Sequence, residues 1–136
     1  MTLAAAITFT WLGMVLAISF LEAPLKFRAP GVTLPLGLGI GRVVFAALNK
    51  VEAVLALGVV VFLVAGPRTV PAVVFAAVAV LALLVQLFAV RPALTRRSDR
   101  VLAGEDGPRS HAHLVYIGLE VVKAAALLAF GVASLA

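Results

Sequence analysis

The chain contains no cysteine among its 136 residues. This absence excludes disulfide bonds, thiolate metal sites, haem attachment through Cys-x-x-Cys-His and S-palmitoylation. Charged residues are also scarce, at 12% of the chain, which is about half of their share in soluble domains. The sequence therefore gives no information on the redox compartment and argues against a soluble globular domain.

Apolar residues dominate instead, with 64% hydrophobic residues and a mean hydropathy of +1.20. A bilayer core of about 30 Å is crossed by roughly 20 apolar residues in a helix. The apolar blocks have this length, and they lack the alternation that is typical of a membrane barrel. We therefore expect an all-α integral membrane four-helix bundle that forms a single domain over residues 1–136. The four spans are expected at residues 3–21, 43–65, 70–90 and 114–135.

Lysine and arginine are distributed unevenly over the three connections. The middle connection holds only Arg68, whereas the first and third hold the others: Lys26, Arg28, Arg42, Arg91, Arg96, Arg97, Arg100 and Arg109. Basic connections stay on the cytoplasmic side. We therefore expect connections one and three to be cytoplasmic and both termini to be extracytoplasmic, in a multi-pass protein of the inner (plasma) membrane. The net charge of +5 then serves orientation and contact with anionic lipid headgroups, and it does not indicate nucleic-acid binding.

The connections carry proline and glycine, which predict where the helices end. Pro24 is expected to break the first helix, and the Leu-Gly-Leu-Gly-Ile-Gly segment of residues 36–41 is expected to be loose at the interface. This segment is either a mobile gate or a kinked entry whose glycines allow close helix contact, and the second interpretation is favoured. Residues 66–71 predict a tight turn, with Pro71 in the first turn of the next helix. Residues 91–110 are expected to form a solvated surface segment.

Two segments of the chain are similar to each other. They share identical residues at Val44/Val115, Leu48/Leu119 and Val51/Val122, a conservative pair at Phe45/Tyr116, and opposite charges at Glu52/Lys123. Each segment opens a long apolar stretch. The similarity predicts a helical hairpin duplicated in parallel, with a carboxylate and an ammonium group at equivalent positions inside the membrane.

Helical spacing places the polar residues of these two segments on single helix faces. Residues at offsets of three, seven and ten share one side of an α-helix. The two sets with these offsets are His113, Tyr116, Glu120 and Lys123 on the fourth span, and Arg42, Phe45, Asn49 and Glu52 on the second. Glu52 and Lys123 lie about 15 Å beyond the first residue of each set. We therefore expect a Glu52–Lys123 ion pair near the bilayer centre, with Asn49 opposite Glu120.

Spans one and three are more uniformly apolar. Trp11 lies near the middle of the first span, where it either covers the polar residues or packs against apolar ones, and packing is favoured. Gln86 is the only strongly polar residue of the third span. The alanines of this span at positions 72, 76, 79 and 82 form a small-residue face, which allows another helix to approach closely, within the chain or in an oligomer.

Short motifs in both halves resemble the small four-helix membrane family typified by transmembrane protein 205. They are Trp11-Leu-Gly13, Phe20-Leu-Glu-Ala-Pro24-Leu-Lys-Phe27, Gly41-x-x-x-Phe45, Asn49, and a histidine at the start of the last span, here His113. The resemblance implies the four-helix fold over most of the chain. The family has no established activity, and tolerance of metal drugs in one branch implies at most export or sequestration. The lack of cysteine argues against soft-metal handling here.

Three roles remain open for the polar residues. The first is binding or translocation of a small solute or ion through a buried cluster of Glu52, Lys123, Glu120, Asn49, His113, Tyr116 and Glu22. The second is a structural or regulatory subunit of a membrane complex, or a homo-oligomer, in which the ion pair only fixes helix packing. The third is a metal- or haem-dependent enzyme, which is the weakest because the two histidines, His111 and His113, point to different sides. We predict no catalytic residues, no metal site and no cofactor.

Overall fold

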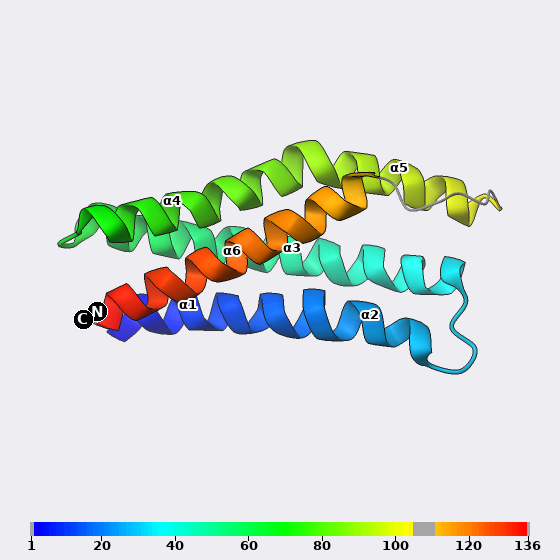
Figure 1. Ribbon diagram of the computed structural model, residues 1–136, viewed down its shortest axis with the longest axis horizontal. Coiled ribbons are helices and arrows are strands. Elements are labelled where there is room, and N and C mark those ends of the chain that lie inside the picture. Colours follow the sequence, from blue (N-terminus) through cyan, green and yellow to red (C-terminus); the bar gives the residue numbers. More distant parts are fainter. Residues whose placement is uncertain (1, 105–110, 136) are drawn as a thin grey trace.

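The computed structural model describes residues 2–104 and 111–135. Within these ranges the protein is helical and contains no strand. Four helical spans lie along its long axis (Figure 1), at Leu3–Arg28, Leu34–Ala65, Val70–Leu102 and His111–Leu135 of the described residues. Each span is long and apolar enough to cross a membrane. The expected four-helix bundle is therefore present, and its spans are longer than the sequence predicted.

The first span does not end at Pro24. It runs through α1 (Thr2–Val15), a π-helical segment η1 (Leu16–Glu22), the short α2 (Ala23–Leu25) and a 3-10 turn η2 (Lys26–Arg28). Pro24 directly follows the π-helical segment η1, and such local adjustments satisfy the backbone groups that a proline inside a helix leaves without a partner. The expected break is therefore wrong, and the helical path continues to Arg28.

The second span, α3 (Leu34–Ala65), begins well before residue 43. The Thr33 hydroxyl accepts a hydrogen bond from the Leu36 N–H at 3.3 Å, and Pro35 lies in the first turn, so both residues act as helix-start signals. The glycine-rich segment is thus helical rather than loose. A Cβ at Gly37 would clash with the Phe27 ring, which agrees with the favoured interpretation that a glycine here allows close contact.

The third span also extends beyond its predicted end. It comprises α4 (Val70–Val85), a π-helical segment η3 (Gln86–Val90) and α5 (Arg91–Leu102). Residues 91–102, which were expected in a solvated surface segment, are helical, and their side chains Arg96, Asp99 and Arg100 are exposed. Pro92 follows the π-helical segment η3, where a local adjustment accommodates it. The rest of the expected surface segment, residues 105–110, lies outside the described residues. The fourth span, α6, covers His111–Leu135.

The turn between α3 and α4 has the predicted form. The Arg68 guanidinium donates to the carbonyl oxygens of Leu63 at 2.8 Å and Val64 at 3.3 Å, which satisfies the free carbonyls at the end of α3. Thr69 caps α4 by accepting from the Ala72 N–H at 3.3 Å. This end of the bundle is thus a short, well-capped connection.

The helices form a bundle in which α3 and α6 are diagonal to each other. Helix α6 packs along α1 and α4, while α3 packs along α1, α4 and α5. Figure 1 shows the same arrangement, with α6 in front, α3 behind it, and α1 and α4 on either side. Side chains that extend inward from α3 and α6 therefore meet on the bundle axis.

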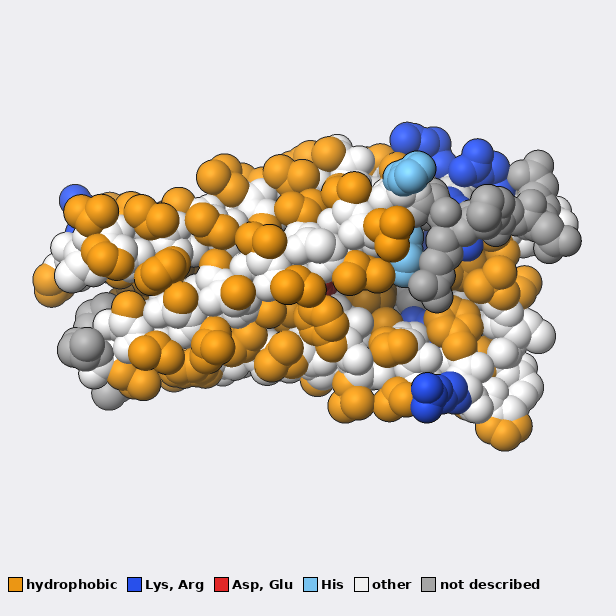
Figure 2. All heavy atoms as spheres, in the orientation of Figure 1, with side chains coloured by type: hydrophobic (Ala, Val, Ile, Leu, Met, Phe, Trp, Pro, Cys, Tyr) orange, Lys and Arg blue, Asp and Glu red, His pale blue; other side chains and the backbone are white. Residues whose placement is uncertain are grey.

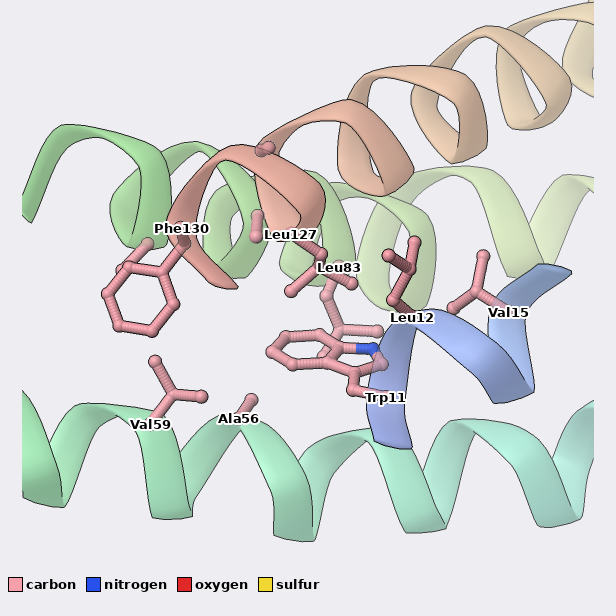
Figure 3. Close-up of a cluster of buried hydrophobic side chains, with 11 residues drawn as sticks. Trp11, Leu12, Val15, Ala56, Val59, Leu83, Leu127 and Phe130 are labelled. Atoms are coloured by element: carbon pink, nitrogen blue, oxygen red, sulfur yellow. The ribbon is translucent and has the colours of Figure 1, made fainter. Parts of the chain in front are cut away.

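A buried apolar cluster fills one half of this axis. Figure 3 shows the Trp11 ring between α3 and the side chains of Leu83 and Leu127, with Val59 and Phe130 farther along. Trp11 and Val15 are fully buried, and Phe130, Leu127 and Val59 nearly so. This half of the interior is a closely packed hydrophobic core.

The outer surface is mostly apolar. Figure 2 shows hydrophobic side chains along the visible face, whereas Lys and Arg side chains gather at the end where α5 lies. We call this the basic end; its described cationic residues are Lys26, Arg28, Arg42, Arg91, Arg96, Arg97 and Arg100. An apolar belt with one cationic end is typical of a helical membrane protein.

The alanine face of α4 packs inside the chain. Ala76, Ala79 and Ala82 are buried, and Ala72 is partly buried against the apolar cluster. Helix α4 packs along α6, and small residues let two helix backbones approach in this way.

We predict that Ala79→Leu destabilises the bundle by about 1–3 kcal/mol, because the added atoms have no space in a packed interior. Ala79 is 0% exposed, whereas its neighbour Val78 is 37% exposed, so Val78→Leu is the matched control and should leave stability nearly unchanged. Thermal unfolding of both variants in the same detergent measures the difference. Equal unfolding temperatures would contradict the packing described.

Candidate functional site: a buried polar cluster

The central feature is an ion pair between Glu52 of α3 and Lys123 of α6. Lys123 Nζ lies 2.5 Å from Glu52 Oε2, and both side chains are 0% exposed. Helical spacing predicted this pair, and the prediction is confirmed. The two residues connect the diagonal helices across the bundle axis.

Lys123 makes two further polar contacts. Its Nζ lies 2.6 Å from Glu120 Oε1, and it donates a hydrogen bond to Gln86 Oε1 at 2.8 Å. The three donor positions of the ammonium group thus have partners on α3, α6 and η3. An ammonium group buried among apolar helices needs this number of partners to offset its lost hydration.

Both carboxylates accept hydrogen bonds from the first span. Trp11 Nε1 donates to Glu52 Oε2 at 2.8 Å, and the Ser19 hydroxyl donates to Glu120 Oε2 at 2.5 Å. Gln86 Nε2 lies 3.3 Å from Glu120 Oε1 and 3.4 Å from the Tyr116 carbonyl oxygen. All four spans therefore contribute to one connected group, which we call the polar cluster: Trp11, Ser19, Glu52, Gln86, Glu120 and Lys123.

The local helix geometry positions these residues. Glu120 and Lys123 are three residues apart on α6 and therefore face the same side. Ser19 lies within η1 and Gln86 is the first residue of η3, so each apolar span contributes its polar side chain from a π-helical segment. Such segments occur often at functional sites because the extra residue re-aims the side chains.

The polar cluster contains two carboxyl groups and one ammonium group. With both carboxylates ionised it carries one net negative charge at positions that are at most 1% exposed. Glu52 Oε1 is also buried, and it has no hydrogen-bond partner among the described residues. A buried negative charge is costly in a membrane interior, so one additional proton or small cation would balance the cluster.

The surroundings of the polar cluster differ between its two sides. On one side lie the apolar residues of Figure 3, which include Leu127 and Phe130, the next inward residues of α6. On the other side, toward the basic end, lie Tyr116, Phe45 and Arg91, in contact through their rings and the guanidinium group. On the apolar side the buried hydroxyls of Thr8 and Ser134 each donate to a carbonyl oxygen of their own helix, so the described charged side chains next to the polar cluster lie toward the basic end.

The other predicted cluster residues have different positions. Asn49 is half-buried, and the polar contacts of Glu120 are to Ser19, Gln86 and Lys123 instead. The expected Asn49–Glu120 pairing is therefore wrong, because the inward line of α3 passes through Leu48 and Glu52 and leaves Asn49 at its edge.

Two more predicted residues lie nearer the basic end. Glu22 Oε2 is 3.9 Å from Lys26 Nζ on its own span, and it has no direct contact with the ion pair. His113 is half-buried near the start of α6, one turn before Tyr116. The structure therefore brings together Glu52, Lys123, Glu120 and Tyr116 of the predicted set.

Three members of the polar cluster, Trp11, Ser19 and Gln86, are absent from the predicted set of cluster residues. Ser19 is one small polar residue in an apolar span, and Gln86 is the only strongly polar residue of the third span. Neither residue belongs to the helix faces on which the prediction was based. Trp11 was expected either to cover the polar residues or to pack, with packing favoured. It does both, since its ring N–H donates to Glu52 and its ring packs in the apolar cluster. The available signal was that all three carry a hydrogen-bonding group in a span that is otherwise apolar. Such a group needs a partner when it is buried.

The structure offers no cluster of metal ligands in the part of the chain that it describes. No three His, Asp or Glu side chains there lie close enough to hold a metal ion. The carboxylates of Glu52 and Glu120 are separated by the ammonium group of Lys123, which binds both.

We predict that Lys123→Met destabilises the protein by about 3–5 kcal/mol, because it leaves two carboxyl groups buried without their cation. Adding Glu52→Gln and Glu120→Gln to this variant removes the remaining charges and should recover part of the loss. Thermal unfolding in one detergent compares the three proteins. A triple variant that is no more stable than Lys123→Met would contradict the charge argument.

The whole chain and its structure were also compared with other proteins. Searches of protein-family models, curated proteins and solved structures gave no match to this chain. A function can therefore be inferred only from the residues and contacts described above.

Proposed function

We propose that this protein binds a small ion, in the first place a proton, at the polar cluster and passes it across the membrane. The observation that carries the proposal is the sharing of one buried ammonium group, Lys123, by two buried carboxylates, Glu52 and Glu120. One more positive charge makes this group neutral. Ionisable residues inside membrane helices commonly form ion and proton pathways.

The asymmetric surroundings support entry from the basic end. Tyr116 lies one turn from Glu120 in that direction, and its hydroxyl is buried near this carboxylate without a hydrogen bond of normal geometry to the described residues. On the far side the ring of Trp11 and the apolar residues of Figure 3 close the axis. Passage to that side would therefore require these side chains to move, as in a gated transporter.

The distribution of charge supports a membrane orientation. The described lysines and arginines lie at the basic end, apart from Arg68 in the opposite turn, Lys50 on α3 and the buried Lys123 on α6. By the positive-inside rule we place the basic end in the cytoplasm of a cell whose inner or plasma membrane holds the protein. The ion would then enter from the cytoplasmic side.

We also propose that the two hairpins arose by duplication. A shift of 71 residues relates Phe45 to Tyr116 and Glu52 to Lys123. The same shift places residues 16–19 of η1 (Leu16–Glu22) on residues 87–90 of η3 (Gln86–Val90). The similar sequences, in contrast, lie in the other two spans. Diagonal placement of α3 and α6 fits a pseudo-twofold axis along the bundle.

Kinship with the family typified by transmembrane protein 205 is part of this proposal. Among the motif residues behind the resemblance, Trp11 contacts the ion pair and Phe45 contacts Tyr116. These positions give the short motifs a common location beside the polar cluster. That family provides no activity to transfer, so the function is argued from this chain.

We predict that purified protein in liposomes carries protons under an imposed membrane potential, and that Glu120→Gln reduces this flux to the level of protein-free liposomes. The substitution keeps the shape of the side chain and removes the charge that makes the site acidic. A pH-sensitive dye inside the liposomes measures the flux. Repeating the experiment with Na⁺ and K⁺ gradients tests small cations.

The control variant is Asp99→Asn, which removes a carboxylate from an exposed pair with Arg42 at the basic end. This variant should conduct like the unchanged protein. A folded Glu120→Gln protein with unchanged flux, or an unchanged protein with no flux of any of the three ions, would overturn the proposal.

A second candidate is a structural or regulatory subunit of a membrane complex. It is favoured by the tight closure of the polar cluster, where Glu52 and Lys123 are 0% exposed. In that case the ion pair specifies helix packing only. Extraction in mild detergent would then yield a fixed stoichiometric partner, and the charge-free triple variant would retain it.

A further inference from the structure

Two cations from different spans lie over the same aromatic ring at the basic end. Lys26 Nζ is 5.9 Å and Arg91 Cζ is 5.1 Å from the centre of the Phe45 ring. Arg91 Cζ is also 4.8 Å from the centre of the Tyr116 ring, which meets the Phe45 ring edge-on. Cations from two spans thus contact the Phe45 ring, and Arg91 contacts the Tyr116 ring as well.

The hydrogen-bond donors of this group are largely unused. Arg91 Nε and Nη2 and the Tyr116 hydroxyl are buried, and they have no hydrogen-bond partner among the described residues. The Tyr116 side chain belongs to a residue that is only 7% exposed. Contact with an aromatic face attracts a cation, but it does not replace hydrogen bonds, and buried donors without partners are costly.

The nearby acidic groups do not neutralise the two cations. Glu120 is engaged by Lys123, Ser19 and Gln86. Glu22 lies 3.9 Å from Lys26, which is a loose contact. Lys26, Arg91 and Glu22 together therefore carry one net positive charge beside unused donors.

The interior face of α3 leaves space for this arrangement. A Cβ at Gly41 would lie 3.2 Å from Lys26 Nζ, so a larger residue would displace the ammonium group. Gly41, Phe45 and Glu52 share one side of α3, because they are separated by about one and two helical turns. The Lys26 side chain, which is 11% exposed, is therefore directed over the inner face of the bundle rather than toward lipid.

We infer that Lys26, Arg91 and Tyr116 form a binding site for a phosphate group, one turn from the polar cluster on the side of the basic end. The forked guanidinium of Arg91 binds two phosphate oxygens, Lys26 adds a point charge, and the Tyr116 hydroxyl donates to a third oxygen. A singly charged phosphate group balances the net charge of the site. Its source is either the headgroup of an anionic lipid or free phosphate.

This site shares Tyr116 with the entry side of the proposed ion passage, but it does not require that any ion passes, and binding tests it directly. We expect inorganic phosphate, added at constant ionic strength to the full chain purified in phosphate-free, lipid-depleted detergent, to raise the unfolding temperature in a saturable way. In a second arm, native mass spectrometry follows retention of phosphatidylglycerol against phosphatidylcholine. Stabilisation by phosphate identifies the free anion, and selective retention of phosphatidylglycerol alone identifies the lipid.

Variants assign the effect to the site. Arg91→Gln and Lys26→Gln should each weaken the observed binding by about tenfold or more, since each removes a charge-assisted contact. Arg100→Gln, at an exposed position of the same end, is the matched control and should bind like the unchanged protein. If Arg91→Gln does not fold, Lys26→Gln and Tyr116→Phe provide the test.

Two results would overturn the inference. One is an unchanged protein that neither responds to inorganic phosphate nor retains phosphatidylglycerol selectively. The other is binding that Arg100→Gln weakens as much as the folded site variants do, because this would reduce the effect to the general charge of the basic end.

Discussion

The structure depends on the ammonium group of Lys123 and the side chains that surround it. In a low-dielectric interior a lone charge is unstable, and its cost decides how the neighbouring helices must face. Here one cation gathers a carboxylate from α3, a carboxylate from its own helix and an amide from η3. Trp11 then donates to the Glu52 oxygen that Lys123 also binds, and Ser19 donates to the second oxygen of Glu120. One group of contacts thus fixes the rotation of all four spans about their axes, which apolar packing alone specifies less strictly.

The apolar half of the bundle has a complementary role. Trp11 belongs to both halves, since its ring packs in the apolar cluster while its N–H binds Glu52. Small residues on α4 let α6 approach closely. The polar contacts define the register, and the close packing holds it. The change from one environment to the other occurs within a single side chain, which makes Trp11 the boundary between them.

The number of spans and the central ion pair could be predicted from the sequence, because the first depends on residue hydropathy and the second on the spacing of charged residues along regular helices. Hydropathy marks a span, and an offset of ten places Glu52 and Lys123 at matched depths. Ser19 and Gln86 could not be placed in the same way, since they lie in π-helical segments that interrupt the 3.6-residue period. Helix ends were missed for a related reason. Pro24 was expected to end the first helix, whereas in the fold it directly follows the π-helical segment η1 and the helical path continues to Arg28.

The two π-helical segments also determine where the following side chains are directed. Such a segment corresponds to one residue inserted into an α-helix, and each residue turns the chain by about 100°. Lys26 follows η1 and Arg91 follows η3. Deletion of one residue from either segment would restore a regular α-helix without turning the residues beyond it, because the wider turn takes up the extra residue. A deletion or insertion elsewhere in these spans would rotate everything beyond it by that angle and would move the cation from the interior toward the lipid. Changes of length in these spans are therefore far more disruptive than changes of residue type.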